Sequence, residues 1–184
     1  MGWKNKDETT IFDFTKPITE DKVLVAQWQE PVQTIGENEP VEEQFIKVTF
    51  KQGAHGQLVP DKDKQDVTAA TVTYKVAKDY TFDDAIKHGL VVPGIAPANY
   101  YKAVDANSGW DKELKLEGQN KTFTAQYEPI ADVIPIDPNV TPDEKLQDDK
   151  PEGMVLVQFK VADDTKFYLD KNVKYYVKQD TEVR

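Results

Sequence analysis

Cysteine is absent from this chain of 184 residues, and histidine occurs only twice. Without cysteine the chain can form no disulfide, no thiolate metal site and no cysteine nucleophile. The chain also lacks a run of about 18 apolar residues, the length that a membrane-spanning helix needs. Its first residues, MGWKNKDETT, are polar and do not resemble a signal peptide. We therefore expect no membrane insertion here, and we expect an export signal and an anchor outside this sequence.

Basic residues are also few, since 23 Lys and Arg stand against 33 Asp and Glu and give a net charge of -10. A nucleic-acid-binding surface needs an excess of Lys and Arg to neutralise phosphates. The acidic balance therefore argues against DNA and RNA as partners. An apolar fraction of 39% is low, but it allows small cores divided among modules.

The clearest positive feature of the chain is self-similarity. A Gly-Trp pair occurs at Gly2-Trp3 and again at Gly109-Trp110, and each pair is followed by a strand-like run that ends in Ala-Gln-aromatic and then Glu-Pro. The segment FIKVTFK (45–51) returns as VLVQFKV (155–161), and VTYKV (72–76) returns as VKYYV (173–177). Repetition at this scale is typical of modular arrays.

Proline and acidic residues divide the chain. Segment 30–43 is acidic, and segment 129–151 holds five of the eleven prolines, so we interpret both as linkers. Ile134 and its apolar neighbours predict that part of the second linker packs on a module. The predicted order is the closing half of a repeat (1–29), an acidic linker (30–43), a complete module (44–128), a Pro-rich linker (129–151) and the opening half of a further repeat (152–184).

Within the complete module, hydrophobic alternation predicts antiparallel strands over 45–51 and 71–77, with a turn at GAHG. Thr81 is the expected N-cap of a short helix that ends at Gly89. Later strands are expected in NYYKAV and KTFTAQYE. This order predicts an α+β module, in which one short helix covers one face of a mixed sheet.

These residues carry a family resemblance. FDFTKPITEDKVLVAQW, preceded by Gly2-Trp3, resembles the closing half of the Listeria–Bacteroides repeat, which is the B-repeat of internalin-type surface proteins. Segment 44–128 resembles a longer relative found in tandem on Gram-positive cell-wall proteins. The resemblance implies a β-grasp-like fold, an extracellular and cell wall-associated location, and a stalk or adhesive role without enzymatic activity or cofactors.

Few side chains suit catalysis or metal binding. His55 lies in a turn and His88 near a helix end, and neither has the partners of a triad or a metal site at a suitable spacing. Three aspartates, in DKDKQD, offer oxygen ligands for calcium. The interleaved lysines, and the lack of the glycine and closing glutamate of a calcium loop, favour a solvated loop instead. These calcium candidates are Asp61, Asp63 and Asp66.

Tyrosines are the candidates for ligand binding. Two adjacent tyrosines on a strand point to opposite faces, so one ring of each pair is available for stacking on a glycan or peptide. The alternative is that outward rings only stabilise cross-strand pairs. Three tryptophans stand at repeated positions, where we expect core or inter-module packing: Trp3, Trp28 and Trp110. The tyrosine candidates are Tyr100, Tyr101, Tyr175 and Tyr176, with Tyr168 as a further exposed ring.

Three functions remain open at this point. The first is a non-enzymatic stalk or adhesion spacer whose partners are neighbouring repeats. The second is a module that binds a host glycan or protein through exposed tyrosines. The third is an accessory module of a secreted hydrolase, which only flanking sequence can distinguish from the first. In addition, half-repeats at both ends would leave sheet edges unpaired. We expect these ends either to associate head to tail between chains or to pack on the middle module.

Overall fold

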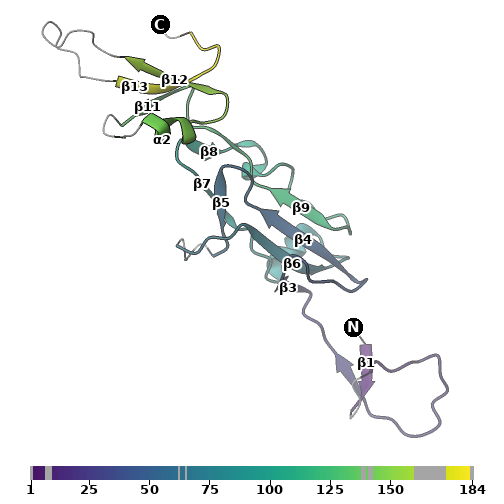
Figure 1. Ribbon diagram of the computed structural model, residues 1–184. Helices are drawn as coiled ribbons and strands as arrows, with labels where there is room; N and C mark the ends of the chain where they lie inside the picture. Colours follow the sequence, from purple (N-terminus) through teal and green to yellow (C-terminus); the bar gives the residue numbers. More distant parts are fainter. Residues whose placement is uncertain are drawn as a thin grey trace, which may run out of the picture.

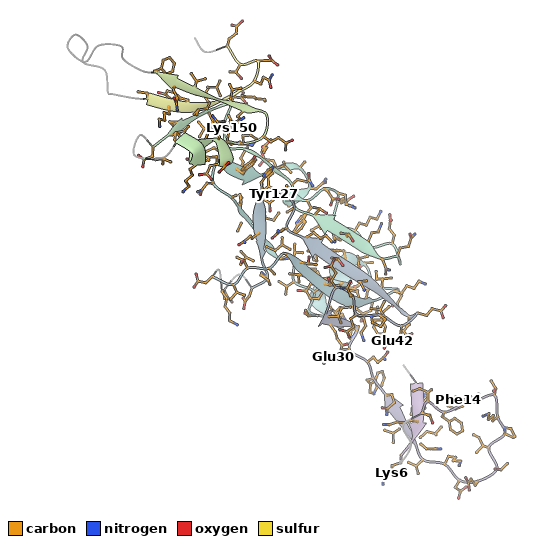
Figure 2. The ribbon with its side chains drawn as sticks, in the orientation of Figure 1. Lys6, Phe14, Glu30, Glu42, Tyr127 and Lys150 are labelled. Carbon is orange, nitrogen blue, oxygen red and sulfur yellow. The ribbon has the colours of Figure 1, made fainter. Side chains whose placement is uncertain are left out.

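The computed structural model describes residues 2–6, 10–61, 63–64, 66–137, 140, 143–159 and 173–182. Three groups of strands follow one another along a line, with the N-terminal hairpin at one end and the C-terminal sheet at the other (Figure 1). We call the part between them, 32–129, the middle unit. The side chains in Figure 2 place Glu30 at the end of the middle unit nearer the hairpin, and Tyr127 at the opposite end.

The N-terminal hairpin pairs β1 (Gly2–Asn5) with β2 (Leu24–Gln27) in antiparallel fashion, and Trp3 lies opposite Ala26. The backbone N–H of Phe12 donates to the Trp3 carbonyl at 2.6 Å. Two strands alone have no second layer to cover their apolar side chains. Trp3 is therefore 48% exposed and Trp28 is 80% exposed, which differs from the expected packing of these two rings.

The middle unit is built on a mixed four-stranded sheet. Its strand order is β3-β6-β4-β9, where β4 runs antiparallel to β6 and parallel to β9. The antiparallel pair that the alternation predicted is thus confirmed. The strands are β3 (Val32–Ile35), β4 (Phe45–Lys51), β6 (Thr71–Ala77) and β9 (Lys121–Thr124).

Alternation directs one face of this sheet into the core. Ile46, Val48 and Phe50 are all buried, because successive residues of a strand point to opposite faces. The Phe50 ring lies 5.1 Å from that of Trp110 and 5.5 Å from that of Phe123. Trp110 is only 2% exposed, so the expectation of core packing is confirmed for this tryptophan.

The range 30–43 differs from the linker that proline and charge predicted. Val32–Ile35 forms β3, which pairs antiparallel with β6 and brings Val32 into the core. The run between Pro31 and Pro40 is too short to show a clear period. Pairing with a strand some forty residues away gives it its structure, and that pairing leaves no local signal.

The predicted helix is α1 (Phe82–Lys87), and it begins and ends as expected. Thr81 caps it in a capping box, since its hydroxyl accepts from the Asp84 N–H while the Asp84 carboxylate accepts from the Thr81 N–H. Gly89 follows the end with a φ of +106°. Ala85 is fully buried against the sheet, and the Phe82 ring meets that of Phe123 edge to face at 6.2 Å.

Two short antiparallel ladders complete the middle unit. One joins β5 to β7 and the other joins β8 to β10. The predicted strand in NYYKAV contains β8, and the one in KTFTAQYE is divided between β9 and β10. The pairing of β5 with β7 was not foreseen. The elements are β5 (Gly56–Val59), β7 (Gly94–Pro97), β8 (Tyr101–Ala103), the 3-10 turn η1 (Ala106–Gly109) and β10 (Tyr127–Pro129).

The C-terminal sheet has the strand order β11-β13-β12 and is antiparallel. Its core contains Ile134, Leu146 from α2 and Tyr176. Within the range 129–151, residues 133–136 therefore form a strand and residues 143–148 a helix rather than a spacer. The expected packing is confirmed for Ile134 and Ile136, whereas Ile130 and Val133 are exposed. The elements are β11 (Val133–Ile136), α2 (Asp143–Asp148), β12 (Met154–Phe159) and β13 (Val173–Lys178).

The architecture is strand-rich and α+β, with mixed pairing in the largest sheet. Two separate apolar cores are present among the described residues, one in the middle unit and one in the C-terminal sheet. Neither helix of the described chain has the length and apolar character needed to cross a membrane.

Candidate functional site

The candidate site is a cleft of about 540 Å³ where the middle unit meets the C-terminal sheet. We call it the second junction cleft, because it lies at the second of the two junctions between units along the chain. The turn after β4, strand β8 and the segment from β9 to β10 line one side, and Glu152 and Gly153, which precede β12, line the other. Figure 2 shows Tyr127 in this region of the molecule. The cleft thus joins residues from two units.

A stacked pair of rings lies at the centre of this cleft. The rings of His55 and Tyr101 are parallel to within 7°, with their centroids 4.0 Å apart. The Glu152 backbone N–H donates to the Tyr101 hydroxyl at 2.8 Å, and the Glu152 carboxylate lies 3.7 Å from Nε2 of His55. The stack therefore connects the turn of one unit to the next unit.

Tyr127 supports the turn that carries His55. Its hydroxyl donates to the Gln52 carbonyl, and its ring meets His55 edge to face at 6.4 Å. Burial raises the pKa of the Tyr127 phenol. A Cβ on Gly53 or Gly56 would come closer than 3.0 Å to neighbouring backbone oxygens, so these two glycines of the turn allow the close approach.

Tyr100 crosses from the middle unit to the other core. It has a φ of +70°, which is rare for a residue with a side chain, and its ring meets that of Tyr176 edge to face at 5.1 Å. Tyr176 is fully buried, and its hydroxyl donates to the Leu146 carbonyl at 2.7 Å. Burial, with smaller effects of Tyr100 and Asp149, raises the pKa of Tyr176 to about 12.

The four predicted tyrosines therefore have different environments. Tyr100, Tyr101 and Tyr176 meet at the junction between two units, whereas Tyr175 lies on the other face of its strand, 6.2 Å from the Phe159 ring. The expectation that Tyr176 offers an exposed ring is wrong, because the ring fills the C-terminal core. Tyr168 lies outside the described residues.

The aspartate loop makes local contacts. Asp61 accepts from the Asp63 backbone N–H at 3.0 Å and lies 3.3 Å from the Lys64 ammonium. These contacts, the backbone hydrogen bond foremost, lower the pKa of Asp61. Within the described ranges no three His, Asp or Glu side chains are arranged to hold a metal ion, and Asp66 is not part of such a group.

A larger groove of about 900 Å³ lies at the junction between the N-terminal hairpin and the middle unit. We call it the first junction groove. Trp28 lines one side, and Phe45, Tyr80 and Gly118 are among the residues on the other. The Gln44 side-chain amide N–H donates to Oε1 of the Gln29 side chain at 3.2 Å across it. The sequence analysis expected core or inter-module packing for Trp28 but did not locate either junction. The aromatic residue after each Ala-Gln pair lies at one of them, Trp28 at the first and Tyr127 at the second.

The polar groups of the second junction cleft are largely used in joining the two units. His55 has one carboxylate nearby, that of Glu152, whose side chain is itself 89% exposed. Comparisons with protein-family models, with curated proteins and with solved structures find no significant match to this chain, so the cleft is interpreted from its own geometry.

Proposed function

We propose that this chain is a non-enzymatic tandem-repeat segment of a bacterial cell-surface protein that acts as a stalk or adhesion spacer. The observation that carries the proposal is a shared register. Val32 and Ile46 flank Val76 in the middle sheet, and Val133 and Val155 flank Val177 in the C-terminal sheet. Both sheets thus place their first, third and second strands side by side. The same row holds Val32 opposite Val76 in one sheet and Val133 opposite Val177 in the other.

The N-terminal hairpin supports the same proposal. Trp3 lies opposite Ala26 there, and Trp110 forms an isolated antiparallel bridge with Ala125 in the middle unit. Each pair joins a Gly-Trp motif to an Ala-Gln-aromatic motif. The hairpin is then the closing part of one repeat, and β11 to β13 are the opening part of another.

The topology of the middle unit favours a β-grasp-like module. An antiparallel pair, β4 and β6, is followed by helix α1, and β9 then returns parallel to β4. This arrangement agrees with the fold that the resemblance to internalin-type repeats implies. Extracellular display on a cell wall follows from the same resemblance and is part of the proposal.

The two junctions favour a spacer. In each, the aromatic residue of the Ala-Gln-aromatic motif lines a hollow together with the residue just before the second sheet strand of the following unit, Trp28 with Gln44 before β4 and Tyr127 with Gly153 before β12. Repeating one junction along a chain projects its units in a line, as they appear in Figure 1. Such a line keeps a distal domain away from the cell wall.

Small-angle X-ray scattering tests the spacer. We expect the elongated profile of a rod for the chain at low concentration, and a broader distribution of distances for Tyr101→Ala, which removes the stack on His55. Lys102→Ala, one position along β8, is the matched control and should match the unsubstituted chain. A compact profile for the unsubstituted chain would rule out the spacer function.

A second candidate function rests on the first junction groove. Trp28 is 80% exposed beside an apolar groove that also contains Tyr80, and exposed aromatic rings in grooves suit stacking on sugars. The groove therefore moves the predicted glycan-binding role from the tyrosines to Trp28. Binding to a glycan array that survives Tyr101→Ala and disappears with Trp28→Ala would support this function. No binding by the unsubstituted chain would count against it.

A further inference from the structure

The C-terminal sheet leaves apolar side chains exposed on one face, on its outer strands β11 and β12, whereas Val177 of the central strand is only 4% exposed on that face. On β12, Val155 is 42% and Phe159 is 55% exposed, and on β11 Val133 is 39% exposed. Their side chains share one face, because Val155 and Val133 lie opposite the same residue of β13 and Phe159 follows at an even spacing. The core of this sheet lies on its other face. The sheet is therefore apolar on both faces, and on one of them the outer strands are exposed.

The corresponding face of the middle sheet is its buried core. Ile46 pairs with Val76 in the middle sheet as Val155 pairs with Val177 in the C-terminal sheet, so Ile46 corresponds to Val155. Four residues further along each strand, Phe50 corresponds to Phe159. Ile46 is 2% exposed and Phe50 is 0% exposed. Two groups cover Phe50. Strand β9 pairs parallel to β4 and places Phe123 directly opposite Phe50, and the Trp110 ring packs 5.1 Å away. The middle unit thus shows what kind of segment fits the uncovered face.

The N-terminal hairpin carries counterparts of both β9 and Trp110, but its described residues pack on no larger sheet. The Trp3–Ala26 pair of the hairpin corresponds to the Trp110–Ala125 pair of the middle unit. Leu24 of β2 and Phe123 of β9 each lie two residues before the alanine, so they correspond to each other. Trp3 is 48% exposed, while Trp110 is 2% exposed. The hairpin and the C-terminal sheet lie at opposite ends of the molecule, beyond the middle unit, so they do not meet within one copy (Figure 1).

We propose that the N-terminal hairpin of one copy docks on the C-terminal sheet of a second copy. Strand β2 adds parallel to the edge of β12, with Leu24 opposite Phe159, and Trp3 covers the Phe159 ring. Addition of a strand satisfies the backbone groups of an edge, and burial of the apolar face supplies the driving force. Because the two surfaces differ, the contact is head to tail and extends into chains of copies.

Complementary variants give the sharpest test. Leu24→Asp disables only the hairpin and Phe159→Asp disables only the sheet, so each variant alone should remain at the 20.9 kDa of one chain in light scattering. Their mixture should form a species of twice that mass and stop there. Val67→Asp, at a 53% exposed valine of the middle unit, is the matched control and should associate like the unsubstituted chain. Monomers at every concentration of the unsubstituted chain would overturn the inference.

Disulfide trapping tests the register itself and does not depend on charged substitutions. Since the chain has no cysteine, Leu24→Cys and Phe159→Cys introduce single thiols. Under mild oxidation the mixed pair should yield many times more crosslinked product than Val25→Cys with Phe159→Cys, because Val25 points to the other face of β2. Equal yields would refute the proposed register. A monomeric chain that still scatters as a rod would refute the inference and leave the spacer function intact.

Discussion

At the scale of single residues, the period of a strand decides which ring of a tyrosine pair is buried. Tyr175 and Tyr176 are neighbours in β13, yet Tyr176 is fully buried while Tyr175 faces the other side with Phe159. Amino-acid composition alone does not distinguish the two tyrosines. Their environments differ because α2 covers only one face of the sheet, and the hydroxyl of Tyr176 finds its acceptor there, in the Leu146 carbonyl.

Tyr176 should make stability depend on pH in the alkaline range. Its pKa is raised from 10.0 to about 12 in the folded chain, so its contribution is complete below pH 10 and is lost as the pH rises toward 12. Tyr176→Phe should lower the free energy of unfolding at pH 7 by about 1–2 kcal/mol, because the Leu146 carbonyl loses its donor. It should also flatten the decline above pH 10. Urea unfolding at several pH values measures both effects.

The control for this substitution is Tyr175→Phe. We expect it to change the free energy of unfolding at pH 7 by less than about 0.5 kcal/mol, since Tyr175 lies on the uncovered face. An unchanged alkaline decline in Tyr176→Phe would show that another group causes it.

At the scale of elements, the turn between β4 and β5 holds the middle sheet and the second junction cleft together. Gln52 and Gly53 contact the β9–β10 segment, and His55 two residues later reaches the C-terminal sheet through Tyr101 and Glu152. The GAHG pattern predicted a turn here. It did not predict that the turn packs against a segment some seventy residues away.

Gly53→Ala should destabilise the chain by about 2 kcal/mol or more. Gly53 has a φ of +71°, and an added Cβ would come closer than 3.0 Å to the Ala125 carbonyl oxygen, so strain and a clash act together. Gly36→Ala is the matched control, because its Cβ would meet nothing nearer than 3.9 Å and its φ is not positive. Thermal unfolding should show a lower midpoint for Gly53→Ala alone. Equal midpoints would contradict this account of the turn.

At the scale of the whole molecule, the two apolar cores belong to different units. The core around Phe50 and the core around Leu146 share no residue, and Tyr100 is the main apolar contact from the middle unit to the second core. Cooperativity requires extensive packing between parts. The junction between the units consists of a few ring contacts and hydrogen bonds. It therefore couples the relative positions of the units more strongly than their free energies of unfolding.

Calorimetry should therefore resolve two unfolding transitions. Phe50→Ala should lower the free energy of unfolding of the middle unit by about 3–5 kcal/mol, and Leu146→Ala that of the C-terminal sheet by about 2–5 kcal/mol, because both side chains are fully buried. Each substitution should shift one transition and leave the other in place. A single transition that both substitutions lower would mean that the units unfold as one.

Much of the local structure follows from the sequence by itself. The alternation of FIKVTFK and TVTYKVA led to two paired strands, and Thr81 and Gly89 marked the ends of the helix, because each of these signals acts within a few residues. The similar motifs also pointed to strands of the middle and C-terminal sheets, namely β4 and β6 in one and β12 and β13 in the other, that pair antiparallel in both sheets. The excess of acidic residues argued against nucleic-acid partners without reference to any fold. The lack of cysteine likewise excluded disulfides, thiolate metal sites and cysteine nucleophiles.

Tertiary structure decided what depends on distant partners. It turned parts of both predicted linkers into the strands β3 and β11, placed β9 parallel to β4, and buried Tyr176 rather than Tyr175. It also created the two junctions, whose residues lie far apart in the chain. Strand pairing and burial depend on contacts between distant segments. The local sequence of a short run flanked by prolines is therefore the same whether or not the run pairs with a strand of a sheet.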